Sequence, residues 1–504
     1  RKKWTWDKVT WGTHLVDCYP GGCSFHVYTK DGIVWREEQS GVYPHIEDGV
    51  PDMNPRGCQK GASFSRVMYG AERLKYPLKR VGERGGGKWQ RITWDEALTE
   101  IADAMLDAIE DKESGPETII HEFGSGEGGM VHGSAPSWRL MRLIGGTTLD
   151  NNGLTSDYNV GLYQTFGKFS FVSSVDDWFH SDLLLIWHMN PMYTRIPSVH
   201  FIWEARYHGT EVVTIAPDYS ASCVHSDLFV PIEAGTDAAL ALAMCRVIID
   251  EDKVNEPFVK EQTDLPLLVR RDDGHFLRAS DREEGSRDDQ FYFLDSTSGE
   301  IVPAPRGTLD LGDIDPSLHG EAEANLKDGS TVEVTPAFEI MRERLRDYTP
   351  EEASRITGIR PNLIRKLARK VAAARAVHLL QGFSICKYYH GDLMERAQAL
   401  LMALTGNFGR KGTGMRGWNS SQLISSHLLK SRPGLEGFLE FARNFRKEEK
   451  RLLDEDDTLS EEMVAIETDK KEVRGHTVAA LPATPLTVPP AFYWYYHCGY
   501  DEVW

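Results

Sequence analysis

The sequence predicts a multi-domain α/β protein built around parallel, doubly wound sheets. Its 504 residues correspond to about three domains of ordinary size. Between residues 180 and 250, short apolar segments alternate with helical segments. Continuous apolar strands that alternate with helices are typical of a parallel sheet covered on both faces. Closely spaced cysteines near the start of the chain indicate a separate small domain before these sheets.

Composition limits the classes of partner. The formal net charge is −19, and 41% of residues are hydrophobic and 26% charged, which is ordinary for a globular protein. The acidic balance argues against nucleic acid, because neutralising phosphates requires a basic face. The sequence has no run of 18 apolar residues, so no direct membrane span is expected. The chain begins at Arg1 rather than Met, so we expect processing or truncation, and the missing signal peptide says nothing about export.

Residues 1–80 carry four candidate metal ligands among short β-like runs. They follow the pattern His14-x3-Cys18-x4-Cys23-x34-Cys58. Closely spaced thiolates select zinc or an iron–sulfur cluster. Structural zinc usually takes two short cysteine pairs. Here Cys58 is a single distant ligand, which favours an iron–sulfur cluster over zinc. Unrelated buried cysteines are the alternative, and we interpret the other four in that way: Cys223, Cys245, Cys386 and Cys498.

A helix is predicted over residues 93–110. Thr93 and Glu96 form a capping-box pattern, and apolar residues follow at helical spacing. A strand at 118–120 then leads into a glycine-rich loop over 124–129. Such a loop after a strand can admit a phosphate or a pterin at a helix N-terminus, although a plain loop fits the pattern equally well.

Polar residues follow two predicted strands, 183–187 and 211–215. Asn190 and Asp218 come after these strands, and Asp237 opens the next helix. In doubly wound sheets, ligands bind beyond the carboxyl ends of the strands. These side chains are therefore placed to recognise the hydroxyl and amino groups of a ribose or a base. Helix caps and turns also favour Asp and Asn, so both interpretations remain open.

The rest of the chain predicts a β insertion followed by a second α/β unit. Residues 266–336 are charged, contain β-like pieces and turn dipeptides, and predict a peripheral β insertion. After further helical periodicity, a strand at 377–380 leads to Gly382 and a helix over 391–404. A glycine-rich loop over 412–418 follows. Two α/β units with ligand-facing ends are thus expected to flank the insertion.

These motifs together resemble one known family. Residues 11–14, Cys18, Cys23 and 57–61 resemble the catalytic subunits of the molybdenum bis-molybdopterin-guanine-dinucleotide oxidoreductases. More narrowly, they are similar to the type II branch of the dimethyl sulfoxide reductase family. That branch includes dimethyl sulfide dehydrogenase, chlorate and selenate reductases, ethylbenzene dehydrogenase and respiratory nitrate reductase. Having His14 rather than Cys as first ligand marks part of the family. Further similar segments are 75–82, 94–97, 216–219, 235–239, 389–392 and 404–407.

The resemblance implies two cofactors and the residues that hold them. A 4Fe-4S cluster would be bound by His14, Cys18, Cys23 and Cys58. Molybdenum bis-molybdopterin guanine dinucleotide would take a protein carboxylate, and the matching residue is Asp157. A hard anionic oxygen suits high-valent molybdenum. The residues expected to bind the dinucleotides are Trp187, Asn190, Asp218 and Asp237 for one, and, within the 382–418 segment, Gly382, Ser384, His390 and Asn407 for the other.

The implied reaction is a two-electron oxygen-atom transfer on a small oxyanion or sulfide such as chlorate, selenate, nitrate or dimethyl sulfide. Electrons would leave singly through the cluster, while the protein positions the reactants and excludes water. Lys60, two residues after Cys58, is expected to supply positive charge between cluster and pterin, unless it is a plain surface lysine. The candidates for facing the substrate are His121, Glu127 and His132, which precede Asp157.

The resemblance also implies partners, a compartment and domain boundaries. The partners would be a ferredoxin-like iron–sulfur beta subunit and a haem b gamma subunit. The compartment would be the periplasm, with an export signal before Arg1. The iron–sulfur domain would cover 1–80, a first pterin-binding domain 81–150 and 376–504, and a second, Rossmann-like one 151–375. We expect the family's C-terminal domain to be missing from this sequence.

Two alternatives from other classes remain, and one alternative reaction within the same family. A nicotinamide dehydrogenase would fit the Rossmann-like pattern, but no Gly-x-Gly-x-x-Gly follows a strand with an acidic residue about 20 positions later. A non-catalytic electron-transfer scaffold would lack molybdenum, and Asp157 and both sets of dinucleotide residues argue against it. Anaerobic hydroxylation of a hydrocarbon, as in ethylbenzene dehydrogenase, competes with oxygen-atom transfer, and the substrate pocket decides between them.

Overall fold

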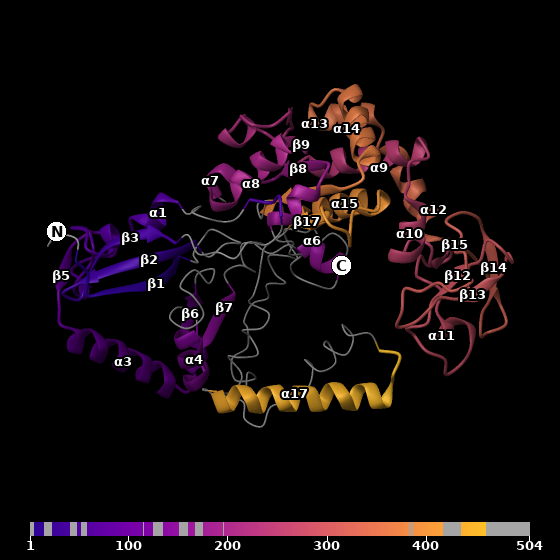
Figure 1. Cartoon of the computed structure of the whole chain (residues 1–504). Helices are drawn as coiled ribbons and strands as arrows, with labels where there is room; N and C mark the ends of the chain where they lie inside the picture. The colour runs from indigo at the N-terminus through magenta and orange to yellow at the C-terminus, as the bar shows by residue number, and fades with distance from the viewer. Residues whose placement is uncertain are drawn as a thin grey trace.

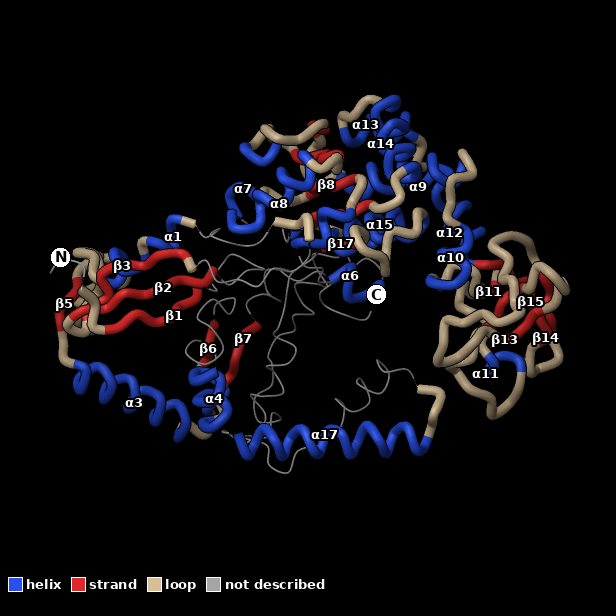
Figure 2. Tube along the Cα trace, viewed as in Figure 1, coloured by secondary structure: helices blue, strands red, loops and turns tan. Residues whose placement is uncertain are grey.

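The computed structural model places several α/β and β units along the chain (Figure 1). It describes residues 5–14, 23–40, 48–51, 58–113, 115–123, 135–150, 160–166, 175–194, 196–382, 385, 387–416 and 435–459. An antiparallel sheet near the N-terminus, a central parallel sheet covered by helices and an antiparallel insertion occupy three separate places, as the tube in Figure 2 shows. Among the described residues, no helix is both long and apolar enough to cross a membrane.

The N-terminal unit is a three-stranded antiparallel sheet made of β1 (Lys8–His14), β2 (Cys23–Lys30) and β3 (Ile33–Gln39). Two short helices, α1 (Gln59–Ala62) and α2 (Phe64–Met68), pack beside it. Gly61 lies so close to the buried Phe25 ring that a Cβ there would meet the ring's Cε2 atom at 2.6 Å. This contact fixes α1 against β2. A hairpin of β4 (Leu78–Arg80) and β5 (Trp89–Arg91) follows.

A parallel βαβ unit comes next. Helix α3 (Trp94–Glu110) confirms the predicted capping box, because Glu96 N donates to Thr93 Oγ1 and Thr93 N donates to Glu96 Oε2. The predicted strand at 118–120 begins later, because residues Pro116–Thr118 form a short 3-10 turn. The unit then contains β6 (Ile120–Phe123), α4 (Ala135–Ile144) and β7 (Thr147–Asp150), and β6 pairs with β7 in parallel.

The central sheet has five parallel strands in the order β10-β9-β8-β16-β17. They are β8 (Leu183–Trp187), β9 (Glu211–Ala216), β10 (Leu228–Pro231), β16 (Val377–Gln381) and β17 (Gly414–Arg416). Alternate residues of β8 enter different cores: Leu183 and Leu185 join one, and Leu184 and Ile186 join the other. Both faces of the sheet are therefore buried, as in a doubly wound fold.

Helices cover both faces of this sheet (Figure 1). The core that contains Leu185 is built with residues of α9 (Asp237–Asp250), α13 (Pro350–Thr357), α14 (Pro361–Ala373) and α15 (Gly391–Leu404). The core that contains Ile186 is built with residues of α8 (Ile196–Tyr207) and with Trp178. The short α7 (Pro191–Thr194) leads from β8 into α8. The expected α/β class is therefore confirmed.

The strand partners correct the expected domain boundary. The resemblance placed residues 376–504 with 81–150, apart from 151–375. In the structure β16 pairs with β8, with Val377 opposite Leu183 and Gln381 opposite Trp187. Residues on both sides of the insertion therefore share one sheet. The sequence shows that both segments are apolar, but burial on both faces does not reveal which strand lies next to which.

Residues 268–336 hold the antiparallel strands, where the sequence predicts a β insertion. A three-stranded sheet of β11 (Leu268–Arg270), β15 (Thr331–Pro336) and β14 (Ala322–Asn325) lies beside the hairpin of β12 (Tyr292–Leu294) and β13 (Ile301–Pro303). The unit has its own small core around Leu268 and Val334. Its flanking and internal helices are α10 (Glu256–Gln262), α11 (Ala279–Arg282) and α12 (Ala337–Arg344).

Two more helices complete the described part of the chain. Helix α17 (Leu435–Glu455) is followed by Thr458, whose hydroxyl accepts from Arg306 Nη1 of the insertion at 2.8 Å. Helix α6 (Val160–Phe166) is joined to α15 by the fully buried Glu395. The carboxylate Oε2 of Glu395 accepts from Gly161 N at 2.8 Å and from Leu162 N at 3.2 Å. This contact links segments more than 230 residues apart.

We expect Glu395→Ala to destabilise the junction of α6 and α15. The substitution leaves two buried backbone N–H groups without their acceptor, which should lower the free energy of unfolding by about 2–3 kcal/mol. The measurement is urea denaturation followed by circular dichroism. Glu395→Gln keeps one oxygen acceptor and should lose less. Equal unfolding midpoints for wild type and Glu395→Ala would contradict this role.

Candidate functional site

The order of the central strands reverses between β8 and β16. From β8 the chain continues outward to β9 and β10, and from β16 it continues in the other direction to β17. In open α/β sheets, ligands bind outside the carboxyl ends of the strands at such a reversal. We call the residues at this place, Trp187, His188, Asn190, Asp218, Asp237, Gly382 and His390, the switch-point edge. Six of its seven members belong to the predicted binding set.

Asp237 joins the end of β8 to the start of α9. Its Oδ1 atom accepts from the indole Nε1 of Trp187 at 2.7 Å, and the Nε2 atom of His188 lies 3.1 Å from the same oxygen. All three side chains are buried. One carboxylate oxygen is therefore shared by two consecutive residues of the β8 end, and Asp237 holds that end in place.

Asn190 is oriented by two serines of the neighbouring loop. The hydroxyls of Ser220 and Ser222 both donate to its Oδ1 atom, the first at 3.4 Å. Among the described residues, no side chain or carbonyl accepts from its Nδ2 group. Asp218, beyond β9, has an exposed carboxylate that accepts no hydrogen bond from any described residue. The β8 and β9 ends thus present an amide donor and a carboxylate acceptor at the same edge.

Gly382, directly after β16, lies against the backbone of the β8 end. A Cβ at this position would overlap the carbonyl oxygen of His188 and meet its carbonyl carbon at 2.7 Å. Gly382 N also donates to Trp187 O at 3.3 Å. Farther along the same loop, Tyr388 packs on Gly235. A Cβ added at Gly235 would lie 3.1 Å from the Tyr388 ring. The β16 loop therefore contacts both the β8 end and the loop that opens α9.

His390 places an unsatisfied imidazole nitrogen at the start of α15. It is the N-cap residue and has a left-handed backbone with φ of 56°. Its Nδ1 atom is buried and lacks a hydrogen-bond partner among the described residues. Buried polar atoms are nearly always paired, and one without a protein partner points to a missing water or ligand.

Asn407 is not brought to the switch-point edge. It is fully buried, its Oδ1 atom accepts from Val377 N at 2.9 Å, and its Nδ2 atom donates to Thr405 Oγ1 at 2.7 Å. Val377 is the first residue of β16, so Asn407 lies at the amino end of the sheet. Gly412 lies there too, since its N–H donates to Asp177 Oδ1 at 2.9 Å. The first part of the 382–418 segment thus lies at the carboxyl edge of the sheet, and Asn407 and Gly412 lie at its amino edge.

The elements that carry three of the four predicted cluster ligands meet. His14 pairs with Cys23 at the end of the β1–β2 pair where the chain passes from one strand to the other, and Cys58 is the buried N-cap residue of α1, which packs on β2. Lys60 is exposed on α1. The described residues contain no group of three metal-ligating side chains. Outside them lie Cys18, Glu127, His132, Asp157 and Ser384, together with the side chains of His14 and Cys23.

His121 belongs to β6, where it pairs with Thr148 of β7, two residues before the strand ends. Its side chain is half-buried, and burial lowers the pKa of His121 below its ordinary value of 6.5. The imidazole is therefore neutral at neutral pH. A neutral imidazole can accept a hydrogen bond or a proton, so His121 is suited to act as a base rather than as an acid.

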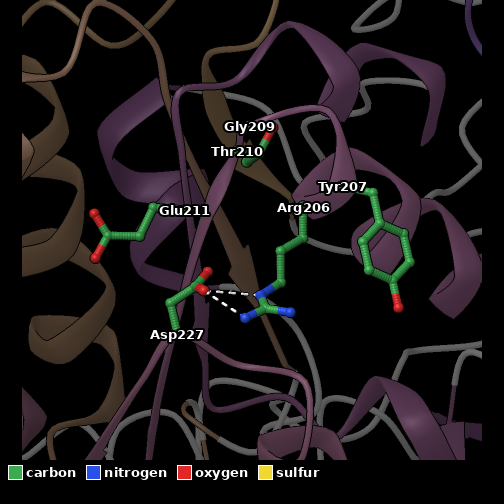
Figure 3. A pocket seen from close by; sticks show the side chains of 6 residues that line it. All are labelled: Arg206, Tyr207, Gly209, Thr210, Glu211 and Asp227. Atoms are coloured by element: carbon green, nitrogen blue, oxygen red, sulfur yellow. Dashed lines mark hydrogen bonds and ion pairs between the residues drawn. The ribbon is translucent and has the colours of Figure 1, made fainter.

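The hollow drawn in Figure 3 lies at the opposite edge of the sheet, beside Glu211, the first residue of β9. Its charged groups already have partners, since Glu211 accepts from Lys370 Nζ and Arg206 binds Asp227. Arg206 Nε donates to Asp227 Oδ1 at 2.8 Å, and Asp227 Oδ2 accepts from Val212 N at 2.9 Å. These contacts lower the pKa of Asp227 against the opposing effect of its burial. The contact between Arg206 and Asp227 therefore joins α8 to the start of β10, and these side chains have a structural role.

Sequence reasoning missed His188, Tyr388 and Gly235. His188 follows Trp187 directly, and its position at the end of a buried strand was the available signal. Nothing in the sequence shows that its imidazole turns back onto Asp237. Tyr388 and Gly235 are more than 150 residues apart, so their contact depends on the pairing of β16 with β8.

We expect Gly382→Ala to disturb the switch-point edge. Gly382 does not have a left-handed backbone, so alanine causes no backbone strain there. The overlap of its Cβ with the His188 carbonyl should lower the free energy of unfolding by about 1–3 kcal/mol, as in an overpacked site. The thermal unfolding midpoint should fall. Gly86→Ala, on an exposed turn where a Cβ would meet only the Glu83 carbonyl oxygen at 3.1 Å, serves as the control and should lower the midpoint far less. A stable Gly382→Ala protein would contradict the close contact.

We expect His121 to make stability depend on pH. Because its pKa is lowered in the fold, the unfolded chain takes up a proton first as pH falls below 6.5. The stability is complete above pH 6.5 and decreases as pH falls from there to the lower value in the fold. His121→Gln should remove this part of the slope in urea unfolding measured across that range. Identical slopes would show that burial does not shift His121.

Comparison with known proteins agrees with this geometry. The family model described as "Molybdopterin oxidoreductase" matches residues 73–478. The chain is 44% identical over 464 residues to the dimethylsulfide dehydrogenase subunit alpha of Rhodovulum sulfidophilum. The aligned region covers 90% of this chain and 50% of that protein. It is 41% identical over 443 residues to the chlorate reductase subunit alpha of Ideonella dechloratans, covering 86% and 47%. The chain thus spans about half the length of these curated relatives.

One further relative and one solved structure complete the comparison. The respiratory nitrate reductase subunit alpha of Haloferax mediterranei is 40% identical over 430 residues, covering 82% of this chain and 43% of that protein. Acetylene hydratase from Pelobacter acetylenicus superimposes with a TM-score of 0.52 at 21% identity, covering 79% of this chain and 44% of that one, which shows the shared fold. The chain belongs to the molybdopterin oxidoreductase family, in its type II dimethyl sulfoxide reductase branch.

Proposed function

We propose that this chain is the catalytic part of a molybdenum oxidoreductase that transfers an oxygen atom to or from a small oxyanion or sulfide. The observation that carries the proposal is the switch-point edge, where polar groups from four separate segments converge within the span matched by the family model. The named relatives act on dimethyl sulfide, chlorate, perchlorate and nitrate. We take these compounds, with selenate, as the substrate class.

The switch-point edge fits a guanine dinucleotide. Guanine offers an N–H and an amino group as donors, which suit the exposed carboxylate of Asp218, and its carbonyl and ring nitrogen suit the Nδ2 donor of Asn190. Gly382 allows the backbone to approach closely, and the Nδ1 atom of His390 has no hydrogen-bond partner in the part of the chain that the structure describes. We therefore assign Trp187, Asn190, Asp218, Asp237, Gly382 and His390 to the molybdopterin guanine dinucleotide, with Ser384 as a further candidate. Asn407 instead supports the start of β16.

The N-terminal unit fits a 4Fe-4S cluster. The backbone pairing of His14 with Cys23 and the packing of α1 on β2 bring the segments of three predicted ligands to one end of the sheet. Cys58 is buried, as a cluster ligand shielded from water should be. We assign His14, Cys18, Cys23 and Cys58 as ligands. Lys60, exposed two residues later, would add positive charge nearby.

When bound, the molybdenum group supplies a two-electron centre that can give or take an oxygen atom. The chain's own residues bind and orient that group and keep water away. We assign Asp157 as the protein carboxylate on molybdenum, because a hard anionic oxygen suits a high-valent metal. The neutral imidazole of His121 can accept a proton near the end of β6, and His132 is a second candidate on the following segment.

Partners and compartment follow from the same proposal. The relatives named above are alpha subunits. We propose an iron–sulfur beta subunit as electron acceptor or donor, a haem b gamma subunit beyond it, and a periplasmic location. These proposals rest on the relatives, which are about twice as long as this chain.

The function is tested on the intact complex under anaerobic conditions. Molybdenum and iron are quantified first, and iron–sulfur absorbance is then followed. Bleaching of the oxidised protein by dimethyl sulfide, or reoxidation of the reduced protein by chlorate, selenate or nitrate, would support oxygen-atom transfer and name the substrate. Bleaching by ethylbenzene alone would instead show hydrocarbon hydroxylation. Absence of molybdenum would leave an electron-transfer scaffold and contradict the proposal.

We expect Cys58→Ser to lose the iron of the N-terminal cluster, because a serine hydroxyl is a poor substitute for a thiolate. Iron per chain and the cluster's electron paramagnetic resonance signal are the measurements. Cys245→Ser is the control. Burial on α9 raises the pKa of the Cys245 thiol, so it stays protonated and cannot act as a ligand. Unchanged iron in Cys58→Ser would contradict the ligand assignment.

A further inference from the structure

His188 has a backbone conformation that side chains seldom adopt. Its φ is 57°, in the left-handed region, where an L-residue pays a steric cost that glycine avoids. The described residues contain four such non-glycine positions. Asp31 and Asp252 are exposed turn residues, whereas His188 and His390 belong to the switch-point edge. Backbone strain that persists in a fold is held there by surrounding contacts and concentrates at functional sites.

Two sets of contacts hold His188. Its side chain is only 8% exposed, and its Nε2 atom lies 3.1 Å from Asp237 Oδ1, the oxygen that also accepts from Trp187 Nε1. Its carbonyl lies directly under Gly382, where no Cβ fits. This single residue therefore touches the start of α9 through its side chain and the end of β16 through its backbone.

The left-handed turn sets the course of the chain after β8. Trp187 still follows the strand direction, and Asn190, two residues past His188, already accepts the first backbone bonds of α7 from Tyr193 and Thr194. The strand must turn sharply within this short stretch to bring Asn190 against Ser222. Glycine would make the same turn without strain, but it would offer no side chain to Asp237.

We propose that His188 is a positioning residue for the guanine dinucleotide. Its imidazole shares Asp237 with Trp187, and this bridge holds the β8 end in the strained turn that presents the Asn190 amide to the ligand. The inference rests on the proposed function, because it takes the dinucleotide as the ligand of the switch-point edge. It adds a residue that does not itself need to touch the ligand.

Substitution by glycine separates strain from positioning. His188→Gly removes the left-handed strain together with the buried imidazole, so relief of strain should offset part of the stability lost with the contact to Asp237, while the ligand is held less well. Asp252→Gly removes an exposed left-handed residue, with φ of 52°, at the far end of α9. Its thermal midpoint should stay level or rise, with ligand binding unchanged.

The measurements are GMP released by acid from the purified complex, per chain, and the Kd of GDP for the cofactor-free complex. We expect His188→Gly to weaken GDP binding about tenfold, because the β8 end loses the imidazole that lies 3.1 Å from the Asp237 carboxylate. His188→Gln restores a donor at similar reach and should recover part of the affinity. Asp237→Asn should weaken binding similarly, and the double variant should lose little more than either one.

The outcomes distinguish the inference from the function beneath it. If wild type releases GMP and binds GDP but His188→Gly does both equally well, the positioning role is overturned and the proposed function stands. Additive losses in the double variant would also overturn the bridge to Asp237. If wild type contains neither molybdenum nor GMP, the proposed function itself fails.

Discussion

The pairing of β16 with β8 is the constraint on which the rest of the structure depends. It brings together segments almost 200 residues apart and creates the reversal of strand order at which the polar loop ends meet. At one end of the pair, Gly382 lies against the His188 carbonyl. At the other end, Val377 N donates to Asn407 Oδ1. Without Gly382 the two loops could not approach, and without Asn407 a buried N–H would be left without its acceptor.

Around this pair, buried polar groups fix the elements that carry the proposed chemistry. Asp237 holds the β8 end through Trp187, and Glu395 holds the first turn of α6. Helix α6 begins three residues after Asp157 in the sequence. Both carboxylates are buried and accept at least one N–H, which is the condition under which a buried charge is tolerated. The fold thus uses satisfied carboxylates to place loops that must bind a ligand.

Much of the edge could be predicted from the sequence, because parallel strands have their carboxyl ends at the same side of a sheet. Asn190, Asp218 and Asp237 each follow a recognisable apolar strand or open a helix, and in the structure they follow β8 and β9 or open α9, at the carboxyl edge of one sheet. The partner of β16 could not be predicted, because an apolar run shows burial but not register. Asn407 illustrates this limit: its motif suggested ligand binding, while its amide is used by Val377 and Thr405 at the far edge. The strained turn at His188 also left no signal, since histidine shows no preference there comparable with glycine.

We infer that the switch-point edge, rather than another part of the sheet, holds a guanine dinucleotide. A cryo-electron microscopy map of the intact complex with its native cofactor tests it most directly. We expect elongated density that crosses Gly382 and ends in a planar base beside Asn190 and Asp218. Density that instead meets the sheet at its amino end, near Asn407 and Gly412, would contradict it.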